Sequence, residues 1–155
     1  MGYAPQGTVG GFRNQFIYRK ALQLVSEIMD LTRHFPKEET FGLQSQMRRA
    51  ATSISSNIAE GYRRSSTKEY IKFLAISYAS CGELQSHTDV ALTMELISEQ
   101  DHKSIMEMEE EMARLLWTTM EKLKMKAHGA RRMAQGEWRK AHGARRMAQG
   151  LRHKV

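Results

Sequence analysis

The chain has 155 residues and a formal net charge of +7, and 41% of its residues are hydrophobic and 26% charged. This length suits one domain and excludes two of ordinary size, and no apolar run approaches the ~20 residues of a membrane-spanning helix. The single cysteine, Cys81, excludes an internal disulfide. We therefore expect a cytoplasmic protein that does not enter a membrane.

The first eleven residues, MGYAPQGTVGG, are rich in glycine, and we expect residues 1–11 to form a flexible leader. Helical periodicity begins at residue 12 and continues to about residue 125. Pro36 should end the first helix, because proline disfavours helical geometry in the residue before it. The predicted inner seam of this helix is Ile17, Ala21, Leu24, Ile28, Leu31 and Phe35.

The second and third segments repeat this spacing. The third, from about residue 67 to residue 97, opens with Ser66 and Glu69 in the pattern of a capping box. The predicted seam of the second helix is Leu43, Met47, Ala50, Ile54, Ile58 and Gly61. That of the third is Tyr70, Leu74, Ser77, Cys81, Leu84, Thr88 and Ala91. A row of small residues beside it would let another helix approach closely: Ala75, Ala79, Gly82 and Ser86.

The fourth segment begins after Ser98, which is a favourable N-cap residue. Its predicted seam is Ile105, Met108, Met112, Leu115, Thr119 and Leu123. We expect the acidic run that contains Glu109, Glu110 and Glu111 to lie largely on the solvated face. Four amphipathic segments with short connections predict an all-α fold, an antiparallel up-down four-helix bundle over residues 12–125.

A basic repeat fills the C-terminal tail, residues 126–155: KAHGARRMAQG at 126–136 returns unchanged at 140–150. The tail holds nine basic residues and one glutamate, so the other 125 residues hold 15 basic and 16 acidic ones. Glycine recurs every seven residues and weakens a helix. We expect the tail to be disordered or a frayed continuation of the fourth helix. It would attract phosphates without specificity through Arg131, Arg132, Arg145 and Arg146.

The residues alone indicate no catalytic site, cofactor or metal. Glu99 and His102 have the spacing of a di-iron ligand pair, but Glu83 and His87 differ in spacing, and the first two seams carry no glutamate. Solvated charges at a helix start are the favoured interpretation. Cys81 lies on an apolar stripe, where a buried, unreactive thiol is expected.

Six basic residues of the body are candidates for phosphate contacts: Arg48, Arg49, Arg63, Arg64, Lys68 and Lys72. One interpretation is structural, because cations near a helix C-terminus complement its dipole. The other is a nucleic-acid-binding patch at one end of the bundle. The sequence pattern favours the first interpretation and leaves the second open.

Two stretches carry a family resemblance: FPKEETFGLQSQMRRAATSISSNIAEGYRR (35–64) and KEYIKFLAISYASCGEL (68–84). They resemble a bacterial four-helix-bundle family that includes proteins encoded by intervening sequences in large-subunit ribosomal RNA genes. The accessory proteins of diversity-generating retroelements are similar in fold. The resemblance covers about residues 12–125. Its motif includes Asn57, Glu60 and Gly61, which we interpret as architectural.

The resemblance implies a homopentamer, with an apolar or small-residue face left for assembly on the first and third helices. It also implies RNA or DNA, and a reverse transcriptase, as candidate partners, because the retroelement relatives bind both. The leading hypothesis is a non-enzymatic oligomeric scaffold or adaptor that binds nucleic acid. The alternative is an assembly module that binds only proteins, and an enzyme is a distant third.

Overall fold

The computed structural model describes the backbone of residues 11–152 and the side chains of residues 11–142. Its elements, in chain order, are η1 (Gly11–Asn14), α1 (Phe16–Thr32), η2 (Lys37–Glu39), α2 (Leu43–Tyr62), α3 (Thr67–Thr93) and α4 (Glu99–Arg152), where η marks a short 3₁₀-helix. Residues 11–152 contain no β-strand, and the all-α prediction is confirmed. The predicted leader, apart from Gly11, lies outside the described residues.

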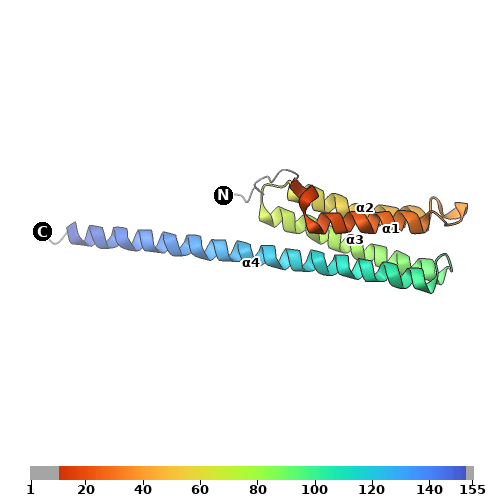
Figure 1. Ribbon diagram of the computed structural model, residues 1–155. Coiled ribbons are helices and arrows are strands. Elements are labelled where there is room, and N and C mark those ends of the chain that lie inside the picture. The colour runs from red at the N-terminus through yellow and green to blue at the C-terminus, as the bar shows by residue number, and fades with distance from the viewer. Residues whose placement is uncertain (1–10, 153–155) are drawn as a thin grey trace. The chain divides into compact units, whose positions relative to one another are not determined.

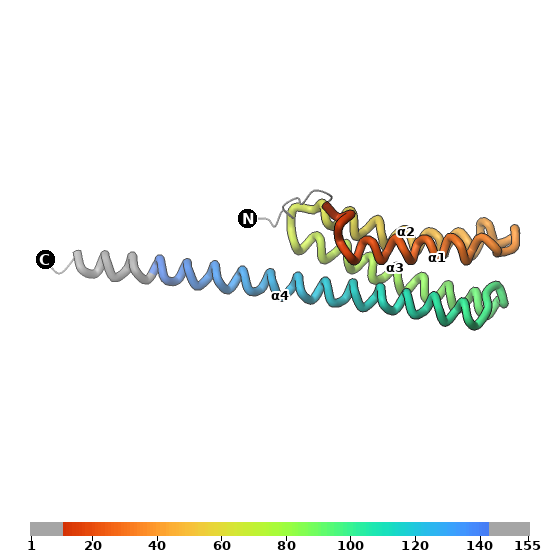
Figure 2. The backbone as a smooth tube through the Cα atoms, in the orientation of Figure 1, coloured from red at the N-terminus to blue at the C-terminus, as the bar shows by residue number. Residues whose placement is uncertain are grey.

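The chain divides into two compact units, Met1–Met120 and Glu121–Val155. In the first unit, α1, α2 and α3 run in alternating directions beside one another, and the part of α4 up to Met120 completes a four-helix bundle (Figure 1). The backbone trace shows the same antiparallel order of α1, α2 and α3 (Figure 2). The predicted antiparallel four-helix bundle is therefore observed.

The predicted seams of α2 and α3 form the centre of this bundle. Every residue predicted on them is buried. Along α1, Leu31 is only half-buried, and Thr32 is buried in its place. Residues spaced alternately by three and four move gradually around a helix that has 3.6 residues per turn, so the predicted seam no longer faces the core at its end. The core is thus a set of four apolar seams that face one another, as helix packing requires.

The seam of α4 differs from the prediction. Its buried side chains are Ile105, Glu109, Met112, Leu116 and Met120. The side chains expected there are only half-buried: Met108, Leu115, Thr119 and Leu123. The sequence offers two adjoining rows that share Ile105 and Met112, and packing selects the row that contains Glu109. The expectation that Glu109 lies on the solvated face is wrong.

The connections follow from local chemistry. At the start of α3, the Ser66 hydroxyl accepts a hydrogen bond from the Glu69 amide at 3.2 Å, as the capping pattern predicts. Before α4, the Ser98 hydroxyl accepts from the Asp101 amide at 3.0 Å. Gly61 permits close contact between α2 and α3, because a Cβ there would lie 2.6 Å from the Phe73 Cβ.

Side chains from α2 hold the C-terminal end of α1. The Gln44 amide donates to the Thr32 carbonyl at 2.7 Å, and the Arg48 Nε donates to the Thr32 hydroxyl at 2.8 Å. The Gln44 bond adds a partner to one of the last carbonyls of α1, and the Arg48 bond ties the Thr32 side chain to α2. In the connection itself, the Glu39 carboxylate accepts from the Leu43 amide at 2.9 Å and so caps α2.

The second unit is helical as far as the structure describes it. Of the two states expected for the tail, the structure shows a continuation of the fourth helix, with α4 extending to Arg152. Gly129 and Gly136 lie within this helix, and a Cβ added at either would meet no described atom within 4 Å. The side chains of Arg145 and Arg146 lie outside the described residues, and the domain boundary at residue 125 stays a prediction.

Candidate functional site

Four of the six predicted phosphate-binding residues lie together where α2 ends and α3 begins. Arg63 and Arg64 follow the last residue of α2, and Lys68 and Lys72 occupy the first two turns of α3. All four side chains are exposed. This turn therefore gathers positive charge at one end of the bundle.

Aromatic rings hold the arginines of this turn. The guanidinium of Arg63 lies 5.5 Å from the centre of the Phe12 ring, and that of Arg13 lies 4.9 Å from the same ring. Arg64 lies 4.6 Å from the Phe73 ring and forms an ion pair with Glu60. Such contacts restrict an arginine while its N–H groups keep capacity for an anion.

Arg13 and Phe12 were not predicted as site residues. They lie just before α1, about fifty positions from Arg63 in the sequence, and the antiparallel order of α1 and α2 brings them to it. The predicted topology would have sufficed to find them, since the start of the first helix must lie near the end of the second. We call Arg13, Arg63, Arg64, Lys68 and Lys72 the basic end.

Arg48 and Arg49 do not join the basic end. They lie on α2 about 21 Å from Arg63 along the helix axis, from the usual rise per residue. Arg48 is half-buried, and besides its bond to Thr32 it donates to the Met29 carbonyl at 3.4 Å. Arg48 thus ties α2 to α1, whereas the Arg49 side chain is exposed.

The family-motif residues on α2 make contacts of a structural kind. The Asn57 amide donates to the Ser53 carbonyl at 2.8 Å and lies within 3.1 Å of the Ser53 hydroxyl, which lies 2.9 Å from the Ser80 hydroxyl of α3. Glu60 pairs with Arg64, and Gly61 is buried against α3. This agrees with an architectural role.

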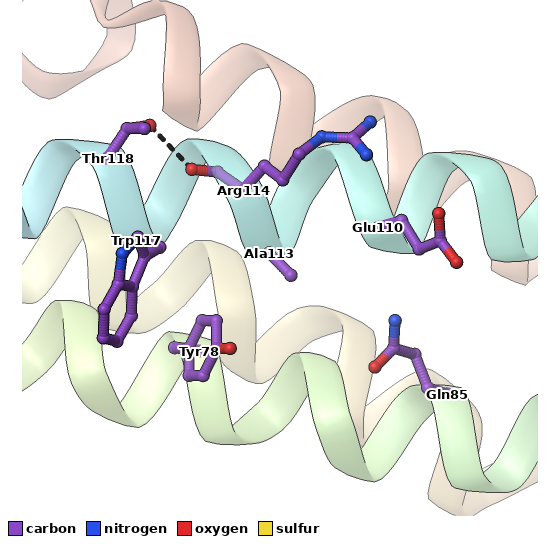
Figure 3. A pocket seen from close by; sticks show the side chains of 7 residues that line it. All are labelled: Tyr78, Gln85, Glu110, Ala113, Arg114, Trp117 and Thr118. Atoms are coloured by element: carbon purple, nitrogen blue, oxygen red, sulfur yellow. Dashed lines mark hydrogen bonds between the residues drawn. The ribbon is translucent and has the colours of Figure 1, made fainter.

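A second feature is a groove of about 560 Å³ between α3 and α4. Figure 3 shows the Tyr78 and Trp117 side chains beside each other in it, and their ring centres are 5.9 Å apart. Glu110 and Arg114 of α4 and Gln85 of α3 also line the groove. Trp117 is 51% exposed, so this groove presents a large aromatic surface.

Histidine, cysteine and carboxylate side chains are the candidate metal ligands of this chain. Within the described residues, no three His, Cys, Asp or Glu side chains are grouped to hold a metal ion. His102 instead lies 2.8 Å from the Asp89 carboxylate, and His87 lies 3.6 Å from Glu83. No described helix has an apolar stretch long enough to cross a bilayer.

Comparison with known proteins identifies the bundle. The sequence model of a family described as 23S rRNA-intervening sequence protein matches residues 13–118. The chain belongs to this family. The matched residues lie within the first compact unit, so the C-terminal tail lies outside the matched region.

A solved structure supports the same fold. It is the crystal structure of a protein of unknown function from the S23 ribosomal protein family of Bacteroides thetaiotaomicron, 24% identical, with a TM-score of 0.63. The match covers 67% of this chain and 97% of the other. None of the curated proteins matches the sequence. Neither description names an enzymatic activity.

Glu109 is the buried titratable group that the sequence pattern did not predict. Its side chain is fully buried, its Oε1 lies 2.7 Å from the Thr88 hydroxyl, and its Oε2 has no hydrogen-bond partner. Burial raises its pKa to about 7, an effect that the Thr88 bond opposes and the charge of Asp89 reinforces. Burial, with a smaller effect of Glu109, also raises the pKa of Cys81 to about 12, so this thiol is unreactive at neutral pH.

The hydrogen bond between Thr88 and Glu109 joins α3 to α4. The Thr88 hydroxyl also lies 3.0 Å from the Leu84 carbonyl, and its one proton cannot serve both acceptors. If the Glu109 carboxyl is protonated, it donates to Thr88 while Thr88 donates to Leu84. The buried Glu109 is therefore a structural link between α3 and α4.

Proposed function

We propose that this protein is a non-enzymatic, oligomeric helical-bundle adaptor of the cytoplasm that binds RNA or DNA through its basic end. The observation that carries the proposal is the cluster of Arg13, Arg63 and Arg64 on the Phe12 and Phe73 rings. Proteins hold nucleic-acid backbones with exposed arginines and lysines, and ring-held arginines lose less freedom when they bind.

Local charge supports this assignment more than net charge does. Residues 1–125 are close to neutral, with 15 basic and 16 acidic groups. The basic end nevertheless gathers five cations, with Glu60 and Glu69 as the nearest acidic residues in the sequence. Interactions between exposed charges fall off over about 10 Å at ordinary ionic strength. A phosphate near the basic end is therefore attracted by the local excess of positive charge, whatever the net charge of the chain.

Exposed apolar side chains support an oligomer. The outward side of α3 carries Ile76 and Val90 at 40–47% exposure, together with the exposed small-residue row that includes Gly82. On α1, Phe16 and Leu22 are also exposed. Surfaces of this kind are typical of subunit contacts. A homopentamer is the assembly that the family resemblance implies, and light scattering that reported a monomer would contradict it.

Fluorescence anisotropy of labelled RNA and DNA duplexes over a salt series tests the basic end. The variant Arg63→Ala/Arg64→Ala should bind more weakly. If each arginine neutralises one phosphate, the slope of log affinity against log salt should become less steep by about 1.8. Arg49→Ala is the matched control, because it removes an exposed α2 arginine about 21 Å away along the axis. If the double variant and the control bind like the wild type, the basic end does not bind nucleic acid.

The second candidate function is an assembly module that binds only proteins, and the α3–α4 groove favours it. The exposed Tyr78–Trp117 pair is of the aromatic kind that anchors protein interfaces. A reverse transcriptase stays a candidate protein partner on the family resemblance. This second function is supported if the protein assembles but shows no salt-dependent binding to either nucleic acid.

A further inference from the structure

Trp138 is an exposed aromatic residue in the basic second unit. It lies in the three-residue spacer, Glu137-Trp138-Arg139, between the two copies of the repeat. Its side chain is 60% exposed and stacks on the His142 imidazole, with ring centres 4.0 Å apart and an interplanar angle of 23°. The His142 Nδ1 lies 3.0 Å from the Trp138 carbonyl, which holds the imidazole in this position.

Positive charge surrounds this ring pair. A surface hollow beside Trp138 is lined by Arg131, Ala134, Gln135 and Arg139. Ala134 is one helical turn before Trp138, and its methyl group is too small to cover the indole. Residues 126–155 contain nine basic residues and only one acidic residue, Glu137, so the potential around the hollow is positive.

We propose that Trp138 and His142, with Arg131 and Arg139, form a stacking site for the unpaired bases of single-stranded RNA or DNA. Aromatic faces within a positively charged surface are the recurring means of binding single strands, since every base has a π-face and every nucleotide a phosphate. The proposal rests on the nucleic-acid function proposed above, but it assigns a separate surface and restricts the ligand to single strands.

A lipid surface fits the tail less well. An amphipathic helix that binds membranes buries a face of several large apolar side chains. By helical periodicity, the other apolar side chains of residues 126–142 on the face that contains Trp138 are small, namely Ala127, Ala130, Ala134 and Ala141. Met133 lies on nearly the opposite side. One indole among alanines offers a base a stacking surface but gives a membrane little apolar area.

The test compares full-length wild type, Trp138→Ala, Trp138→Phe and Arg63→Ala/Arg64→Ala by anisotropy. The probes are a labelled oligouridylate, a labelled oligothymidylate and a duplex, each of about 20 nucleotides to exceed one site. Trp138→Ala should weaken single-strand binding about tenfold or more, Trp138→Phe should retain most of it, and the duplex affinity should change less than about twofold. The salt slope should stay unchanged, because the indole carries no charge.

The controls separate this proposal from the basic end. If Trp138→Ala binds both single strands like the wild type, the stacking site is refuted, whatever the basic-end variant does. If Trp138→Ala loses single-strand binding while Arg63→Ala/Arg64→Ala keeps duplex binding, the stacking site is supported and nucleic-acid binding by the basic end is refuted. Unequal loss of the two single-stranded probes identifies RNA or DNA as the preferred ligand.

Tryptophan fluorescence supplies a direct readout. The sequence has two tryptophans, so Trp117→Phe leaves Trp138 as the sole indole of the full-length chain. Stacking should quench its emission when oligouridylate or oligothymidylate is added. Quenching by neither oligonucleotide, or a blue shift with phosphatidylcholine–phosphatidylglycerol vesicles in place of quenching, would overturn the proposal in favour of a lipid surface.

Discussion

Replacement of Glu109 by glutamine should remove most of the pH dependence of stability between about pH 4.5 and pH 7. Glu109 is fully buried, its pKa is raised from the ordinary 4.5 to about 7, and one carboxylate oxygen has no partner. The folded protein keeps this proton to about pH 7, whereas the unfolded chain releases it near pH 4.5. Because the folded state binds more protons in this interval, the free energy of unfolding falls as pH rises.

The difference between the two pKa values corresponds to about 3 kcal/mol lost between pH 4.5 and pH 7. At pH 5, where the wild-type carboxyl is mostly protonated, Glu109→Gln should differ little in stability, because the amide can still bond to Thr88. At pH 8 the variant should be more stable by about 2 kcal/mol. The remaining ~1 kcal/mol is the cost of a buried amide N–H without a partner.

Urea unfolding followed by circular dichroism at several pH values measures this difference. Protein concentration must be held constant, because assembly would add a concentration-dependent contribution to the stability. Glu107→Gln is the matched control: Glu107 is on the same helix but exposed, so its replacement should preserve the wild-type pH dependence. If Glu109→Gln follows the wild-type curve across this range, Glu109 is not a buried neutral acid.

Three further substitutions test the packing and the contacts between helices. Gly61→Ala should destabilise the bundle by about 1–3 kcal/mol in urea unfolding, because the new Cβ would lie 2.6 Å from the Phe73 Cβ and 2.9 Å from the Tyr70 Cδ2. In a single chain, the Cβ of Gly82→Ala on α3 would meet no atom within 4 Å, so the variant should be more stable to unfolding by up to about 1 kcal/mol. If a subunit contact covers that face, light scattering should instead show weaker assembly. Arg48→Ala should lower stability by about 1–2 kcal/mol through its lost bonds to Thr32 and Met29 and leave nucleic-acid affinity unchanged; equal stability would refute its structural role.

Periodicity predicted α2 better than α4, for a physical reason. The α2 sequence has one apolar row bordered by polar residues, so only one orientation buries it. The α4 sequence has two adjoining rows, one through Met108 and Leu115 and the other through Leu116 and Met120. Periodicity alone cannot choose between them. The partner of Glu109 is Thr88 on another helix, and a glutamate within an acidic run carries no local sign of burial.

The basic end was predictable in part. Arg63, Arg64, Lys68 and Lys72 are close in sequence, so any turn between α2 and α3 must bring them together. Arg13 joins them only through the antiparallel order of the helices. The separate position of Arg48 also follows from helix length, but its bond to the Thr32 hydroxyl depends on the rotation of α1 relative to α2, which the sequence pattern does not specify.

The bonds that Gln44 and Arg48 make to Thr32 have a consequence for how this family can vary. They fasten the corner between α1 and α2 from the side of α2, and within residues 34–42 only Glu39 caps a helix through its side chain. Phe41, in the same connection, is 96% exposed. Insertions or new chain ends between the buried Phe35 and Glu39 would therefore leave these side-chain bonds intact. This connection is therefore where the chain should tolerate added residues.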